Sequence, residues 1–147
     1  MEPKKFLELA QALAFEPPQP AKLRTATSRA YYAAYNVSVE TLERMGVQIS
    51  KGPGGHGQVQ RFLGNSKNEE LEQISSDLGT LHSGRIAADY RLADPKAENP
   101  INVKALVGHA KKVIDTLERC CAGPNKHAII KAMKNHQQVD KGAPREG

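Results

Sequence analysis

Residues 21–45 read AKLRTATSRAYYAAYNVSVETLERM, and their apolar side chains are spaced as they are on one face of a helix. Prolines crowd residues 17–20, and proline lacks the amide donor that a helix interior needs. Gly46 follows the run, and glycine readily takes the left-handed conformation that ends many helices. The run therefore predicts one long helix, roughly Ala21 to Met45.

Helical spacing also continues outward from this segment in both directions. No segment alternates apolar and polar side chains as a half-buried strand does, so we expect an all-α fold. Further helices are expected at roughly 6–13, 56–63, 68–90 and 99–122, with a weaker one at 125–138. A chain of 147 residues fits one domain, which we place at 1–122. Residues 123–147 are expected to form a basic C-terminal extension, a helix followed by a disordered tail.

The charge of the chain is positive but unevenly distributed. There are 21 Lys and Arg against 16 Asp and Glu, a formal net charge of +5 with a pI near 9.3. The excess lies mainly between Arg44 and Lys67, where no acidic residue stands, and after Asn125. Basic side chains near phosphates release counterions, which favours nucleic-acid binding. A solvated surface explains the same distribution, and the sequence leaves both interpretations open.

The cysteines and the apolar segments indicate the compartment. Cys120 and Cys121 are neighbours, so the chain offers neither a disulfide framework nor a zinc site. No stretch approaches the roughly 20 apolar residues of a membrane span, and the first residues are too polar for a secretory signal. We therefore expect a cytoplasmic protein that uses no membrane, metal or cofactor. The glycine loop at 52–55 lacks the lysine and hydroxyl ending of a phosphate loop.

Polar and aromatic side chains share one face of the long helix. At 100° per residue, one sector of this helix holds Ser28, Tyr31, Tyr32 and Tyr35, with Arg29 and Asn36 on its flank. The rings either pack the core with their hydroxyls at its edge, or line a polar groove that stacks bases and contacts phosphates. The pattern alone does not separate these two readings.

The helix expected at 68–90 places charges where its apolar stripe should lie. Arg85 and Asp89 continue the line of the preceding leucine and isoleucine side chains, with His82 just beside it. Burying a charge is costly unless it is paired, and an Arg and an Asp four residues apart on a helix can meet. The pair therefore either orders the core or enters a cleft, where Arg85 would hold a phosphate bidentately.

Three blocks together resemble one branch of the HEPN family of helical proteins. They are Ser28-Arg29-Ala30-Tyr31-Tyr32-Ala33-Ala34-Tyr35, His56-Gly57-Gln58-Val59 and Arg85-Ile86-Ala87-Ala88-Asp89-Tyr90. The resemblance covers roughly residues 4–121. It implies an up-and-down four-helix bundle core with additional short helices, usually as a homodimer. Such proteins occur in prokaryotic toxin–antitoxin and defence operons beside nucleotidyltransferases, and many are metal-independent endoribonucleases.

The resemblance also implies a catalytic pattern, in which an Arg holds the scissile phosphate and a His a few residues later moves protons. No His stands at Ile86–Leu92, so we expect RNA binding with slow or absent cleavage. The residues expected to act in catalysis are Arg85, Asp89 and Tyr90. Those expected to contact RNA or nucleotide are Ser28, Arg29, Tyr32, Asn36, His56 and Arg61. The alternative function is a non-catalytic module that docks onto a nucleotidyltransferase or antitoxin partner, or binds its nucleotide.

Overall fold

The computed structural model describes the backbone of residues 1–142 and the side chains of residues 1–137. This part of the chain is helical and contains no strand, which confirms the all-α prediction. The α-helices are α1 (Lys4–Phe15), α2 (Pro20–Arg44), α3 (Gly55–Gly64), α4 (Glu69–Tyr90), α5 (Pro100–Cys120) and α6 (Lys126–Gly142). The 3₁₀ helix η1 (Pro95–Glu98) between α4 and α5 was not expected, and α6 extends past its expected end at residue 138. The predicted disordered tail lies outside the described residues.

The helix ends follow the capping residues that the sequence provides. Pro20 occupies the first position of α2, where its missing amide costs nothing, and Gly46 follows the helix with a φ of 86°. The side chain of Asn68 accepts from the amide of Leu71 and caps α4. Asn99 caps α5 in the same way. These residues mark the two ends of α2 and the starts of α4 and α5.

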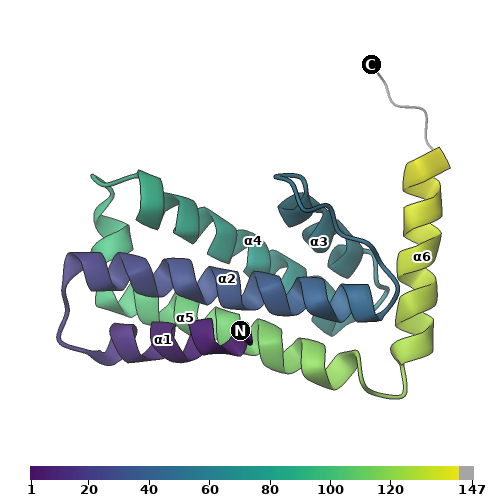
Figure 1. Cartoon of the computed structure of the whole chain (residues 1–147), viewed down its shortest axis with the longest axis horizontal. Coiled ribbons are helices and arrows are strands. Elements are labelled where there is room, and N and C mark those ends of the chain that lie inside the picture. The colour runs from purple at the N-terminus through teal and green to yellow at the C-terminus, as the bar shows by residue number, and fades with distance from the viewer. Residues whose placement is uncertain (143–147) are drawn as a thin grey trace.

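Four helices, α1, α2, α4 and α5, pack lengthwise around a common core (Figure 1). Figure 1 shows α1 and α4 running in one direction and α2 and α5 in the other. Helix α2 contacts the other three, so its residues are buried on several sides. The largest fully buried side chains include Tyr31, Leu42, Leu81, Ile114 and Leu117.

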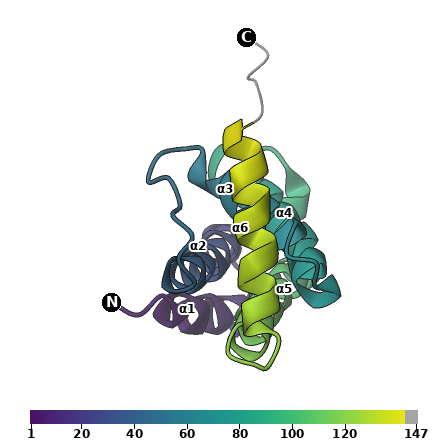
Figure 2. The same ribbon diagram turned by 90° about the vertical axis from the view of Figure 1, so that its right-hand side faces the viewer.

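The two remaining helices lie at one end of this bundle. Helix α3 packs mainly on α4 and also touches α2, whereas α6 crosses the end of the bundle and touches α3 (Figure 2). Burial of Ile129 and Met133 attaches α6 to the core. None of the described helices combines the length and apolar character that crossing a bilayer requires.

Candidate functional site

The Arg85 side chain lies between α4 and α2 and joins several of the predicted site residues. Its Nε lies 3.0 Å from Asp89 Oδ2, and its Nη2 donates to the hydroxyl of Tyr32 at 2.8 Å. The side chains of Arg85 and Asp89 are 17% and 30% exposed. The two charges therefore do meet, but they meet at the edge of the core rather than inside it.

Aromatic rings flank the Arg85 guanidinium. Its central carbon lies 5.2 Å from the ring centre of Tyr32 and 5.4 Å from that of Tyr90. Cations are attracted to ring faces at such distances. Tyr90 is the last residue of α4 and is 70% exposed, so one of its faces is open to solvent.

Two further predicted residues extend this group along α2. Ser28 donates from its hydroxyl to Asp89 Oδ2 at 3.3 Å, and Arg29 Nη2 donates to Ser28 Oγ at the same distance. The guanidinium of Arg29 also lies 5.1 Å from the ring centre of Tyr32. We call this group the Arg85 cluster; it comprises Ser28, Arg29, Tyr32, Arg85, Asp89 and Tyr90.

Two histidines meet beside the Arg85 cluster, and this pairing was not predicted from the sequence. His82 lies one helical turn before Arg85 on α4, and His56 lies near the start of α3. Their ring centres are 5.2 Å apart. His56 also stacks on Tyr35, with ring centres 4.3 Å apart, and its Nδ1 is hydrogen-bonded to the hydroxyl of Tyr31. We call Tyr31, Tyr35, His56 and His82 the His–Tyr cluster.

Burial and positive charge act together on these imidazoles. Burial lowers the pKa of His56, and the neighbouring His82 and Arg85 lower it further. Burial likewise lowers the pKa of His82, with Arg85 again contributing. Both histidines are nevertheless only partly buried, so solvent reaches them. Burial also raises the pKa of the Tyr31 phenol far above its usual range, so its hydroxyl stays protonated at any ordinary pH.

Helix α3 approaches α2 closely at its first residue, Gly55, because glycine has no side chain. A Cβ at Gly55 would lie 2.6 Å from the hydroxyl oxygen of Tyr35 and would also collide with the carbonyl oxygen of Ser50. Any larger residue would therefore push α3 away from α2. The glycine sets His56, the next residue, onto the ring of Tyr35.

Two predicted binding residues stay apart from this group. Asn36 donates from its side chain to the carbonyl of Tyr32 on its own helix, at 2.8 Å. Arg61 is exposed on α3, with its guanidinium turned back toward Gly57. Among the hydrogen bonds and ion pairs of the described residues, Asn36 reaches only the backbone of Tyr32, and Arg61 reaches no member of the Arg85 cluster. The roles of Asn36 and Arg61 in binding therefore stay predictions from the sequence.

Sequence reasoning also missed Arg24, which is buried and organises the end of α4. It donates to the carbonyls of Ala87 and Ala88 at 3.0 Å and to the carboxylate of Glu98 at the same distance. The nitrogen that serves Ala87 and Ala88, Nη1, also reaches the carbonyl of residue 91, and Nη2 donates to the carbonyls of residues 92 and 94. The sequence could have indicated that Arg24 lies near this site, because it stands one turn before Ser28 on the same face of α2. Arg24 thereby positions the segment that carries Asp89 and Tyr90.

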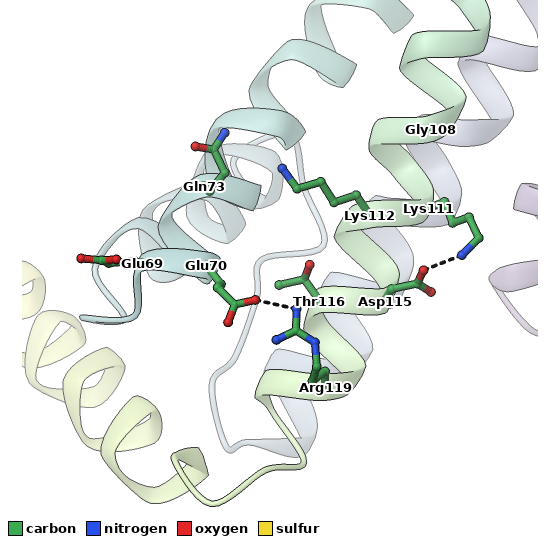
Figure 3. Close-up of a pocket in the computed structure, with 9 residues that line it drawn as sticks. All are labelled: Glu69, Glu70, Gln73, Gly108, Lys111, Lys112, Asp115, Thr116 and Arg119. Carbon is green, nitrogen blue, oxygen red and sulfur yellow. Dashed lines mark hydrogen bonds and ion pairs between the residues drawn. The ribbon is translucent and has the colours of Figure 1, made fainter.

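A separate groove lies between the first part of α4 and the second half of α5 (Figure 3). It has a volume of about 720 Å³. Its charges largely neutralise one another, since Arg119 pairs with Glu70 and Lys111 pairs with Asp115. It contains none of the predicted site residues, and nothing in its lining indicates a ligand.

In the described part of the chain, no three His, Cys, Asp or Glu side chains lie together so that they could bind a metal ion. Comparison with known proteins gives no further guide: no family model, no curated protein and no solved structure matches the chain. We therefore infer the function from the Arg85 cluster and the His–Tyr cluster.

Proposed function

We propose that this chain is a HEPN-type, homodimeric, RNA-directed protein of a prokaryotic toxin–antitoxin or defence module, which binds an RNA phosphate at Arg85. The observation that carries the proposal is the Arg85 cluster. A permanently charged guanidinium stands at the edge of the core, held between two tyrosine rings and oriented by Asp89 and the Tyr32 hydroxyl.

The Arg85 guanidinium has N–H donors left over for a ligand. Its hydrogen bond to Tyr32 engages Nη2, and Asp89 lies beside Nε without accepting a well-directed hydrogen bond from it. Among the described side chains, Nη1 has no acceptor. A phosphate oxygen would supply one, and charge-assisted bonds of this kind are roughly twice as strong as neutral ones.

The surroundings suit a nucleotide as well as a phosphate. The exposed ring of Tyr90 offers a stacking surface next to the guanidinium, and base stacking on an aromatic ring contributes about 1–3 kcal/mol. Single-stranded RNA exposes its bases for such contacts. A strand that places its phosphate at Arg85 would therefore bring a base within reach of Tyr90.

Unpaired basic side chains favour a polyanionic ligand. Arg44, Lys51, Arg61 and Lys67 are exposed, and none pairs with an acidic side chain within residues 1–137. Many other lysines and arginines of the bundle have acidic partners, among them Lys22 and Lys111. The unpaired group lies along the end of α2, α3 and the loops beside α3. Phosphates along an RNA strand would find free cations there.

The proposal is tested by titrating labelled single-stranded RNA into the protein at several salt concentrations in EDTA. We expect wild type to bind and to weaken as salt rises. Arg85→Ala should bind about tenfold more weakly, which corresponds to about 1.4 kcal/mol, with a salt slope smaller by about one. Lys111→Ala is the matched control, because Lys111 is an exposed cation that pairs only with Asp115. Equal affinities for wild type and Arg85→Ala would overturn the proposal.

A second function is favoured by a different feature, the apolar side chains exposed near the end of α4. Tyr90, Leu92 and Ile101 are all largely exposed there. Exposed apolar groups of this kind are typical of protein contacts. The alternative is therefore a non-catalytic module that docks onto a nucleotidyltransferase or antitoxin partner. A protein that binds no RNA at any salt concentration would favour it.

A further inference from the structure

The two histidines of the His–Tyr cluster lie beside the position where the RNA phosphate would bind. His82 precedes Arg85 by three residues on α4, so their side chains are neighbours on one face of that helix. His56 comes from α3, and its ring centre lies 5.2 Å from that of His82. The positive charge of Arg85 acts on both imidazoles. A phosphate at Arg85 would therefore bring negative charge next to them.

The groups that face the two imidazoles are aromatic or positive. From α2, Tyr35 stacks on His56 with ring centres 4.3 Å apart, and the ring of Tyr31 lies 5.6 Å and 5.4 Å from the two imidazoles. From α4, Arg85 is the charged side chain that acts on both. Asp89 is engaged with Arg85 at 3.0 Å, and within residues 1–137 no carboxylate of a neighbouring helix is among the groups that act on either ring.

These surroundings keep the imidazoles neutral while the site is empty. Burial disfavours their charged forms, and so does the charge of Arg85, which is why the pKa values of His56 and His82 are lowered. A bound phosphate offsets the charge of Arg85 and attracts a proton to the imidazoles. Binding of RNA therefore raises both pKa values.

We propose that RNA binding at Arg85 is coupled to proton uptake by His56 and His82, so that the site holds RNA more tightly as the pH falls. This inference rests on the proposed function, since the RNA must bind at Arg85. Such coupling is reciprocal: if bound RNA favours the protonated imidazoles by some factor, protonated imidazoles favour RNA by the same factor. The pair then regulates the affinity of the site.

The spacing of the pair sets how many protons are taken up. Two positive imidazoles with ring centres 5.2 Å apart repel each other, so the first proton enters more readily than the second. The hydroxyl of Tyr31, which is hydrogen-bonded to Nδ1 of His56, can donate to a neutral ring or accept from a protonated one. We therefore expect up to about one proton per bound strand.

The sign and size of the pH dependence follow from this shift. The affinity should be high and constant below the pKa of the free pair, and low and constant above the pKa of the RNA-bound pair. Between these two values it should fall as the pH rises. A shift of one pKa unit corresponds to a tenfold change in affinity, so we expect wild type to bind RNA at least about tenfold more tightly at pH 5.5 than at pH 8.

The experiment measures affinity and proton uptake separately. A short, labelled single-stranded RNA is titrated at fixed salt in EDTA from pH 5.5 to pH 8. Calorimetry in two buffers of different ionisation enthalpy then counts the protons taken up for each strand bound. The variants are Arg85→Ala and the double variant His56→Gln/His82→Gln. His127→Gln is the matched control, because His127 is an exposed histidine on α6.

We expect wild type and His127→Gln to take up between about half a proton and one proton per strand near pH 6.5. The double variant should bind RNA at pH 8 within about threefold of wild type, because its histidines are neutral there in both proteins. Its affinity should change less than about threefold down to pH 5.5, with proton uptake near zero. Arg85→Ala should bind weakly and lose the uptake.

The failures are distinguishable. A wild-type affinity that stays constant from pH 5.5 to pH 8 overturns this inference and leaves the proposed function standing, and so does a double variant that keeps the wild-type pH dependence. Absence of RNA binding at any pH overturns both. If circular dichroism shows that the double variant does not fold, NMR of wild type decides. The resonances of His56 and His82 must titrate at a higher pH with RNA than without it, and equal titrations overturn the inference.

Discussion

Replacing Arg24 with Met should destabilise the fold far more than replacing Arg85 with Met. Arg24 donates hydrogen bonds to five backbone carbonyls and to Glu98. Methionine keeps much of the aliphatic volume but offers no donor. The carbonyls at the end of α4 would then face a buried thioether, and the bond to Ala88 is fully buried.

The magnitude follows from the number of bonds. Counting about 0.5–1 kcal/mol net for each carbonyl bond gives a loss of about 3–5 kcal/mol, which agrees with the usual effect of removing one partner from a buried charged network. Arg85 has one hydrogen bond and a partly exposed ion pair, so Arg85→Met should cost only about 1–2 kcal/mol. Arg91 is exposed and donates no side-chain bond within residues 1–137, which makes Arg91→Met the control.

Urea denaturation followed by circular dichroism measures this difference. With an m-value of about 2 kcal/mol/M, Arg24→Met should lower the unfolding midpoint by roughly 1.5–2.5 M. Arg91→Met should leave it nearly unchanged. A loss of less than about 1 kcal/mol for Arg24→Met would refute the assignment of Arg24 as the structural arginine. A loss of about 3–5 kcal/mol for Arg85→Met would show instead that Arg85 is a buried structural cation.

Two further predictions concern the His–Tyr cluster. The pKa values of His56 and His82 are lowered in the folded chain, so the unfolded chain binds protons first as the pH falls below about 6.5. The stability that these histidines contribute should therefore be fully present above that pH and decrease as the pH falls toward the folded pKa values. The urea midpoint of a His56→Gln/His82→Gln variant should vary less than that of wild type between pH 7 and pH 5. An unchanged pH dependence in this variant would contradict the lowered pKa values. Gly55→Ala places a methyl group against Tyr35 and should cost about 1–3 kcal/mol in thermal or urea melts, whereas Gly54→Ala meets nothing within 4 Å and should be nearly neutral. Equal stabilities for these two variants would show that Gly55 does not set the approach of α3 to α2.

Most of the helical framework could be predicted from the sequence, because it depends on local rules. Apolar spacing and the breaks at Pro20 and Gly46 place α2 within a residue of its observed bounds. The contact between Arg85 and Asp89 is also local, since residues four apart on a helix face each other. The blocks on α2 and α4 therefore pointed to side chains that do lie together.

What could not be predicted depends on where separate helices come together. The approach of His56 to His82 requires the loop before α3 to fold back onto α2, and no local spacing encodes that path. The role of Arg24 depends on the backbone of residues 87–94, which is distant in sequence. Asn36 is the opposite case, because its side chain donates to a carbonyl of its own helix, a local partner that a helical projection does not show.

The most direct test of the account is to observe the histidines while RNA binds. The chain has five histidines, so imidazole carbon–proton resonances can be assigned by substitution and followed by NMR as a short single-stranded RNA is added in EDTA. A DNA-substituted 2′-deoxy position would prevent cleavage during the titration. We predict that the resonances of His56 and His82 shift in proportion to bound RNA, that these shifts disappear in Arg85→Ala, and that His127 on α6 stays unchanged. RNA that binds without moving the resonances of His56 and His82 would contradict the placement of the site at Arg85.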